Sequence, residues 1–142
     1  MILHAGLVAL RCGGLWRGAL IEGESGAGKS DLALRALAAG FTLVADDRVV
    51  VFASGGRVYG RAPAPLAGLI EARGVGVLSR RSLPFARVVL RVTLASEAVE
   101  RMPEPSVARL EGVDVAAAQL WPFAASAPAK LAALIEHLGG GL

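Results

Sequence analysis

The chain has 142 residues, of which 54% are hydrophobic and 19% are charged, and its formal net charge is +3. This length fits one domain, residues 1–142, with one core, and the composition excludes a disordered chain. No apolar run reaches the length of a membrane helix and the start lacks a signal peptide, so we expect a cytoplasmic protein without a membrane partner. The scattered arginines and few aromatic residues argue against nucleic acid as a partner.

The hydrophobic pattern predicts an α/β domain with a mixed, largely antiparallel sheet and few helices. In chain order, we expect a strand pair over 2–21 joined by a glycine turn, a helix over 31–39, an apolar strand over 41–52, a short strand at 57–59, a short helix or extended turn within 63–72, a strand over 87–94, one strand around 109–115, and a closing helix over 127–138 followed by glycines 139–141. This pattern holds too few helices for a large doubly wound sheet.

A glycine-rich motif lies between the second expected strand and the first expected helix. It reads Gly23-Glu24-Ser25-Gly26-Ala27-Gly28-Lys29-Ser30 and matches the phosphate-binding pattern Gly-x-x-x-x-Gly-Lys-Ser. In this pattern backbone N–H groups surround the phosphates, the lysine reaches the β- and γ-phosphates, and the serine hydroxyl can bind magnesium. The sequence therefore predicts a P-loop phosphotransferase that binds ATP and Mg²⁺.

Two acidic residues, Asp46 and Asp47, interrupt the apolar stretch that follows the expected helix. Burying two carboxylates is costly unless they have partners, and a P-loop enzyme needs an acid near the phosphates. In a right-handed strand–helix–strand unit, the second strand is parallel to the first and ends at the same edge. We therefore predict that Asp46 lies beside the phosphate loop, where it holds magnesium or handles a proton. A solvated turn with two acids is the alternative interpretation.

Four segments, in this order, resemble the catalytic domain of the HPr kinase/phosphorylase family. They are His4-Ala5-Gly6-Leu7-Val8, the phosphate loop, Leu43-Val44-Ala45-Asp46-Asp47 and Ile70-Glu71-Ala72-Arg73-Gly74-Val75-Gly76. The resemblance implies a fold like that of PEP carboxykinase and an ATP-dependent kinase that phosphorylates a serine of the phosphocarrier protein HPr. It also implies a truncated form that lacks the family's N-terminal domain.

The resemblance assigns roles to residues at matching positions. Asp46 corresponds to the acid that accepts the proton of the HPr serine and returns it in the reverse reaction. Lys29 and His4 correspond to the other catalytic positions, and Ser30 and Glu71 to the magnesium ligands. These assignments agree with the acid that the phosphate loop requires at its edge.

Two further residues are candidates for contacts with phosphate or with the partner protein. Arg73 lies in the segment that corresponds to the family's signature near the γ-phosphate, and it is either a surface charge or a clamp on the transferred phosphoryl group. Asp47 is the other candidate, beside Asp46.

The sequence departs from the family pattern in two places. The arginine that the family carries before the strand at 87–94 has three candidates, namely Arg80, Arg81 and Arg87. The family's Gly-Arg-Asn element, associated with dephosphorylation, falls near residues 128–130, where only Lys130 offers a positive charge. Kinase action is therefore expected, and the reverse activity is left open.

The leading hypothesis is an ATP-dependent serine kinase that acts on HPr. A small-molecule P-loop kinase and a nucleotide-binding sensor without catalysis are the alternatives, although the chain shows no insertion large enough for a second substrate pocket. Exposed strand edges and the resemblance predict a homo-oligomer, with the family's hexamer as its form.

Overall fold

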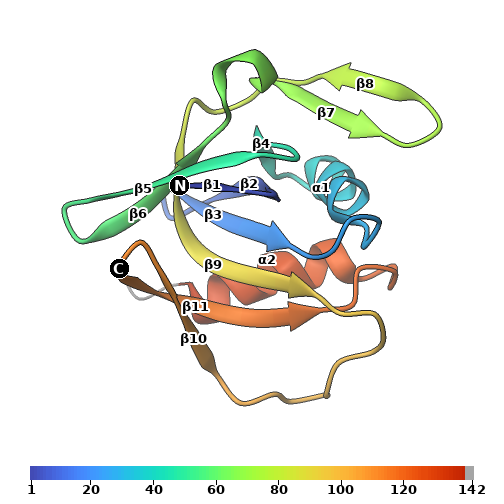
Figure 1. The fold of residues 1–142 in the computed structure, drawn as a ribbon. Helices are drawn as coiled ribbons and strands as arrows, with labels where there is room; N and C mark the ends of the chain where they lie inside the picture. Colours follow the sequence, from blue (N-terminus) through green and yellow to red (C-terminus); the bar gives the residue numbers. More distant parts are fainter. Residues whose placement is uncertain (140–142) are drawn as a thin grey trace.

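Residues 5–22 form an apolar β-hairpin, and the rest of the sheet is arranged around it (Figure 1). The computed structural model describes residues 1–139. Its strands are β1 Ile2–Leu3, β2 Ala5–Cys12, β3 Leu15–Glu22, β4 Thr42–Ala45, β5 Val49–Ser54, β6 Arg57–Arg61, β7 Leu69–Ala72, β8 Gly76–Ser79, β9 Ala86–Leu94, β10 Ser106–Leu110 and β11 Val113–Leu120. Its helices are α1 Lys29–Ala38 and α2 Ala127–Leu138, with a 3-10 turn at Ala64–Leu66.

Nine of these strands form one mixed sheet, in the order β1-β5-β6-β9-β3-β2-β4, with β11 beside β9 and β10 beside β11. The pairs β3–β9 and β9–β11 are parallel, and the other strand pairs of this sheet are antiparallel. Strands β7 and β8 form a separate hairpin. The predicted fold class, a mixed and largely antiparallel sheet with few helices, is therefore confirmed.

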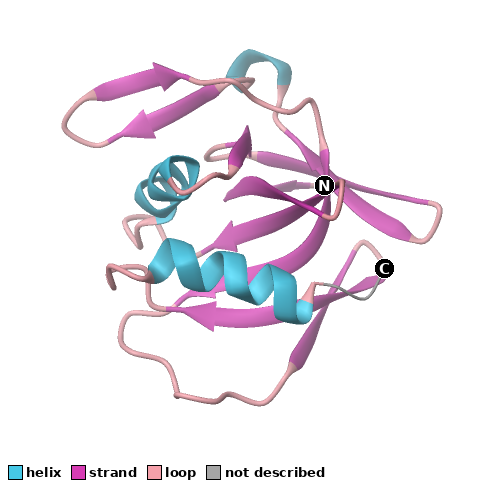
Figure 2. Ribbon diagram, turned by 180° about the vertical axis from the view of Figure 1, so that it is seen from behind, coloured by secondary structure: helices cyan, strands magenta, loops and turns pink. Residues whose placement is uncertain are grey.

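Both helices pack against the same face of the sheet (Figure 2). Helix α1 contributes Leu32 and Ala36 to this core, and α2 contributes Leu131 and Ile135, all of them fully buried. The spacing of these residues places them on one side of each helix. A second apolar cluster, which includes Leu7, Leu20, Val51 and Val88, joins β2 and β3 to β5, β6 and β9.

Strands β3 and β4 run parallel with β2 between them, because β2 is antiparallel to both. The chain leaves β3 through the phosphate loop and α1 and enters β4, so the predicted strand–helix–strand unit is confirmed. The carboxyl ends of β3 and β4 meet at one edge of the sheet. This geometry brings the phosphate loop and Asp46 to the same edge.

Three expectations about local structure were wrong. The strand expected over 41–52 is two strands, since β4 ends at Ala45 and pairs with β2, whereas β5 starts at Val49 and pairs with β1 and β6. The single strand expected around 109–115 is a β10–β11 hairpin whose turn is Glu111-Gly112, with φ of 49° and 77°. A left-handed turn of this kind reverses the chain where an apolar pattern alone suggested continuity. Residues 69–72, expected within a short helix or turn, form β7 because they pair with β8. The expected glycines 140 and 141 lie outside the described residues.

Candidate functional site

The phosphate loop joins β3 to α1, and its backbone has the conformation that the glycine pattern requires. Gly26 and Gly28 have φ of 85° and 101°, values that side-chain-bearing residues rarely adopt. Lys29 begins α1 and is 92% buried, with 8% of its surface exposed. Its Nζ donates hydrogen bonds to the carbonyl oxygens of Gly23 at 2.8 Å and Glu24 at 2.9 Å. The charged amino group of Lys29 is therefore bound to the backbone at the start of the phosphate loop.

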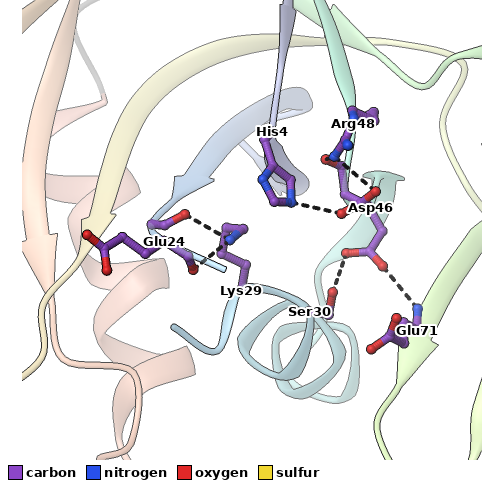
Figure 3. A network of polar contacts seen from close by, with 9 residues as sticks. His4, Glu24, Lys29, Ser30, Asp46, Arg48 and Glu71 are labelled. Atoms are coloured by element: carbon purple, nitrogen blue, oxygen red, sulfur yellow. Dashed lines mark hydrogen bonds and ion pairs between the residues drawn. The ribbon is translucent and has the colours of Figure 1, made fainter. Parts of the chain in front are cut away.

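Asp46 follows β4 directly, and each of its two carboxylate oxygens accepts a hydrogen bond (Figure 3). The Ser30 hydroxyl donates to Oδ1 at 2.8 Å, and the backbone N–H of Glu71 donates to Oδ2 at 3.0 Å. The residue is 6% exposed, so these two bonds compensate for the loss of water around a buried carboxylate. They join the phosphate loop helix, β4 and β7 at one point.

His4 lies between β1 and β2 and reaches the same region. Its Nε2 is 2.9 Å from Oδ1 of Asp47, while Arg48 Nη1 contacts the other oxygen, Oδ2, at 3.0 Å. Asp47 adopts φ of 70°, a left-handed conformation that turns its carboxylate towards the histidine. All three side chains are substantially exposed, so this group faces solvent at the rim of the site.

The structure brings together most, though not all, of the residues that the sequence singled out. Figure 3 shows His4, Lys29, Ser30 and Asp46 around one common space, with Glu71 beside Asp46. The bond from Glu71 to Asp46 comes from its backbone and not from its side chain. Glu71 lies in β7, whereas without the family resemblance it would be taken for a helical residue.

Arg73 lies in the exposed turn between β7 and β8. Among residues 1–139 the structure gives its guanidinium no hydrogen-bond or ion-pair partner. The interpretation of Arg73 as a surface charge and the interpretation as a phosphoryl clamp therefore both stay open.

Of the three arginines considered for the family's missing position, Arg87 is the one that β9 places far from the phosphate loop. It pairs with Tyr59 at the start of β9, while Thr93 near the end of β9 pairs with Glu22, which directly precedes the loop. Six residues of strand separate the two points, roughly 20 Å. Burial, followed by the nearby charge of Arg57, lowers the pKa of Arg87. Position 87 therefore belongs to the opposite end of the sheet.

An ion pair that the sequence did not single out supports the start of the phosphate loop. Arg91 of β9 contacts both carboxylate oxygens of Glu22, with Nη2 2.9 Å from Oε2. The hydrogen bonds that Arg91 donates to the carboxylate of Glu22 raise the pKa of Arg91. The sequence signal that could have indicated this pair is a charged residue within each of two expected strands, because partly buried charges require a partner.

The loop between β3 and α1, with a lysine and a serine in the first turn of the helix and an acid after β4, defines the class of P-loop domains. Residues 3–96 match the family model described as the HPr serine kinase C-terminal domain. The chain belongs to this family.

Similar proteins carry matching names. An HPr kinase/phosphorylase of Streptococcus thermophilus is 47% identical over 73 residues, which are 51% of this chain and 24% of that protein. Another, of Leptothrix cholodnii, is 44% identical over 75 residues, 52% of this chain and 23% of that protein. The chain thus matches about a quarter of the length of these curated relatives.

A solved structure extends the similarity of the fold beyond the matched segment. The Hpr(Ser) kinase/phosphatase of Coxiella burnetii superposes with a TM-score of 0.79, covering 96% of this chain and 88% of that one. The sequence identity is 21%, so this likeness describes the fold. It includes α2, β10 and β11, which lie beyond the segment matched by the family model.

Proposed function

We propose that the chain is an ATP-dependent kinase that phosphorylates a serine of an HPr-like phosphocarrier protein. The observation that carries this proposal is the position of Asp46, a buried carboxylate that two hydrogen bonds hold at the phosphate loop. Family membership and the names of the relatives support the choice of acceptor. We propose further that residues 1–142 form one catalytic domain.

The phosphate loop binds the triphosphate of ATP. Its residues are Gly23, Glu24, Ser25, Gly26, Ala27, Gly28, Lys29 and Ser30. Backbone N–H groups and the start of α1 face the phosphates, where a helix N-terminus favours negative charge. Lys29 exchanges its bonds to the carbonyls of Gly23 and Glu24 for the β- and γ-phosphate oxygens. Because those carbonyls already hold the amino group beside the loop, little rearrangement is needed.

Asp46 is the general base of the transfer. It takes the proton of the acceptor serine as the serine oxygen bonds to the γ-phosphorus and the bond from that phosphorus to the β-phosphate oxygen breaks, which releases ADP. Each carboxylate oxygen has a second lone pair, so Asp46 can accept this proton while Ser30 and Glu71 keep it oriented. His4 acts at the rim, where its contact with Asp47 fixes the ring beside the path of the acceptor.

The residues present fit a magnesium ion held mainly by substrate. The Ser30 hydroxyl and the exposed carboxylate of Glu71 are hard oxygen donors, which Mg²⁺ prefers. Among residues 1–139 no group of three or more His, Cys, Asp or Glu side chains converges to form a site. Water and phosphate oxygens would complete the coordination of the ion. When bound, Mg²⁺ neutralises charge on the phosphates.

Partner and compartment follow from the proposed reaction. The partner is the HPr-like protein, with no role for nucleic acid or membrane, and the compartment is the cytoplasm. Neither helix of residues 1–139 has the length and apolar character needed to cross a bilayer. Assembly into a homo-oligomer, a hexamer in the expected form, stays a prediction.

Transfer of labelled γ-phosphate from ATP to purified HPr tests the proposal. We expect HPr to be labelled by the unmodified chain and labelling to fall roughly 10²- to 10⁴-fold in Asp46→Asn. Asp114→Asn, which alters an exposed acid of β11, is the matched control. ATP-dependent binding of HPr without labelling would favour the sensor. If HPr is neither bound nor labelled, the small-molecule kinase becomes the favoured hypothesis.

A further inference from the structure

The loop that follows β11 lies against the phosphate loop. Strands β3, β9 and β11 are mutually parallel, so their carboxyl ends share one edge of the sheet. Figures 1 and 2 both show the β3–α1 loop and the β11–α2 loop side by side at this edge. Two ring carbons of Phe123 lie 3.5 and 3.6 Å from the position that a Cβ on Gly28 would occupy. Phe123 thus lies beside Gly28 of the phosphate loop, close enough to contact any side chain at that position.

Arg35 holds this second loop in place. Its side chain projects from α1 and donates to the carbonyl oxygens of Pro122 and Ala124, the residues on either side of Phe123, with a distance of 3.4 Å to Ala124. The same guanidinium is paired with Asp31 at 3.0 Å. The helix that starts at the phosphate loop therefore also fixes the backbone on both sides of Phe123.

Phe123 packs against a neighbouring aromatic ring but stays largely exposed to solvent. Its ring meets Trp121 edge-to-face, with centroids 6.4 Å apart and planes at 79°. Even so, 60% of Phe123 is exposed. Packing explains the contact with Trp121. It does not explain why a phenyl ring whose flanking backbone is fixed by Arg35 faces water next to the phosphate loop. A ring in this position offers a flat apolar surface to a ligand.

We propose that Phe123 stacks on the base of the nucleotide whose phosphates occupy the loop, with Arg35 as the residue that positions it. This inference rests on the proposed binding of ATP. In open sheets with parallel strands, ligands lie across the carboxyl ends of the strands, so a nucleotide anchored after β3 extends towards the ends of β9 and β11. A base has a π-face that stacks well on an aromatic side chain.

The test compares ATP with inorganic tripolyphosphate, which carries the phosphates but no base, by isothermal titration with Mg²⁺. In Phe123→Ala we expect the dissociation constant for ATP to rise about tenfold or more, while that for tripolyphosphate stays unchanged. Phe123→Tyr, which keeps the ring, is expected to bind ATP like the unmodified chain. Phe85→Ala is the matched control, because Phe85 is likewise more than half exposed, at 54%, and its ring meets that of Tyr59 edge-to-face with centroids 6.0 Å apart, on a different element.

A spectroscopic readout gives a second, independent check. The chain has two tryptophans, and in Trp16→Phe only Trp121 reports. We expect ATP to change the fluorescence of Trp121 in this variant, and tripolyphosphate to change it much less.

Equal weakening of ATP and tripolyphosphate in Phe123→Ala would overturn the inference, since Phe123 would then only support the phosphate loop. Unchanged ATP binding in Phe123→Ala would overturn it as well. Failure of the unmodified chain to bind either ligand would overturn the proposed function itself, and the inference with it. That last result is recognisable because it does not depend on any variant.

Discussion

The Ser30 hydroxyl lies 2.8 Å from the Asp46 carboxylate, although the strands that lead to these residues, β3 and β4, have β2 between them. Strand β2 belongs to the hairpin that also forms β3, so this hairpin both leads into the phosphate loop and separates β3 from β4. Helix α1 starts at Lys29 and leads the chain away from the loop, and β4 then runs back to the same edge and ends just before Asp46. The contact therefore depends on the path through α1 and β4 as much as on the two residues.

Replacing Ser30 tests its role as a magnesium ligand. In Ser30→Ala we expect the Mg²⁺ concentration that supports half-maximal ATP binding to rise at least about tenfold, because one hydroxyl donor and the orientation of Asp46 are lost together. Ser30→Thr keeps the hydroxyl and is expected to behave like the unmodified chain. Titration of ATP binding at a series of Mg²⁺ concentrations measures this, and an unchanged requirement in Ser30→Ala would exclude Ser30 as a ligand.

The pair His4 and Asp47 is expected to affect transfer and not stability. Both side chains are about half exposed, so His4→Gln and Asp47→Asn are expected to change the free energy of unfolding by less than about 0.5 kcal/mol. We expect His4→Gln to lower the rate of HPr labelling about 10²-fold, and Asp47→Asn to lower it less.

A double-mutant cycle decides whether the two residues act as a unit. If Asp47 works by orienting His4, the rate of the double variant equals that of His4→Gln alone. Additive losses would show instead that each residue contacts substrate separately.

The sequence predicted the parts of the site that depend on neighbours in the chain. The phosphate loop, the helix after it and the acid at the end of the next strand all follow from motif and spacing, and the structure brings Ser30 and Asp46 together as expected. Contacts between residues that are far apart in the sequence could not be predicted from it. The backbone N–H of Glu71 reaches Asp46 only because β7 pairs with β8 above the site, and no local pattern indicates that pairing.

Phe123 and the Glu22–Arg91 pair show the same limit. An isolated phenylalanine in a loop resembles any other apolar residue, and its position beside Gly28 appears only when the ends of β3 and β11 are brought together. In the sequence, Glu22 looks like an ordinary polar residue at the end of a strand, directly before the phosphate loop. Its partner is 69 positions away, on a strand that pairs in parallel with its own.

Breaking the Glu22–Arg91 pair is expected to destabilise the fold. The side chains are 21% and 23% exposed, so removal of Arg91 leaves a partly buried carboxylate without its two donors. We expect Arg91→Gln to lower the free energy of unfolding by about 1.5–3 kcal/mol, as judged by urea titration. The Arg109–Asp114 pair is about two-thirds exposed or more, so Asp114→Asn serves as control with a change below about 0.5 kcal/mol. Equal effects of the two variants would contradict the structural role of Glu22.

The sheet also contains a glycine that packing alone requires. Gly60 of β6 has no positive φ, but a Cβ there would lie 2.6 Å from Leu7 Cδ2 and 2.9 Å from Val49 Cγ1, both in the second apolar cluster. We expect Gly60→Ala to lower the free energy of unfolding by about 1–3 kcal/mol, because the added methyl must displace fully buried side chains. Gly6→Ala is the matched control, since a Cβ on this strand glycine of β2 would meet only Ala45 O at 3.8 Å. Urea titration of both variants measures the difference. Because Gly60 lies away from the phosphate loop, Gly60→Ala is expected to bind ATP with unchanged affinity at temperatures where it remains folded, and a specific loss of ATP binding without loss of stability would contradict this assignment.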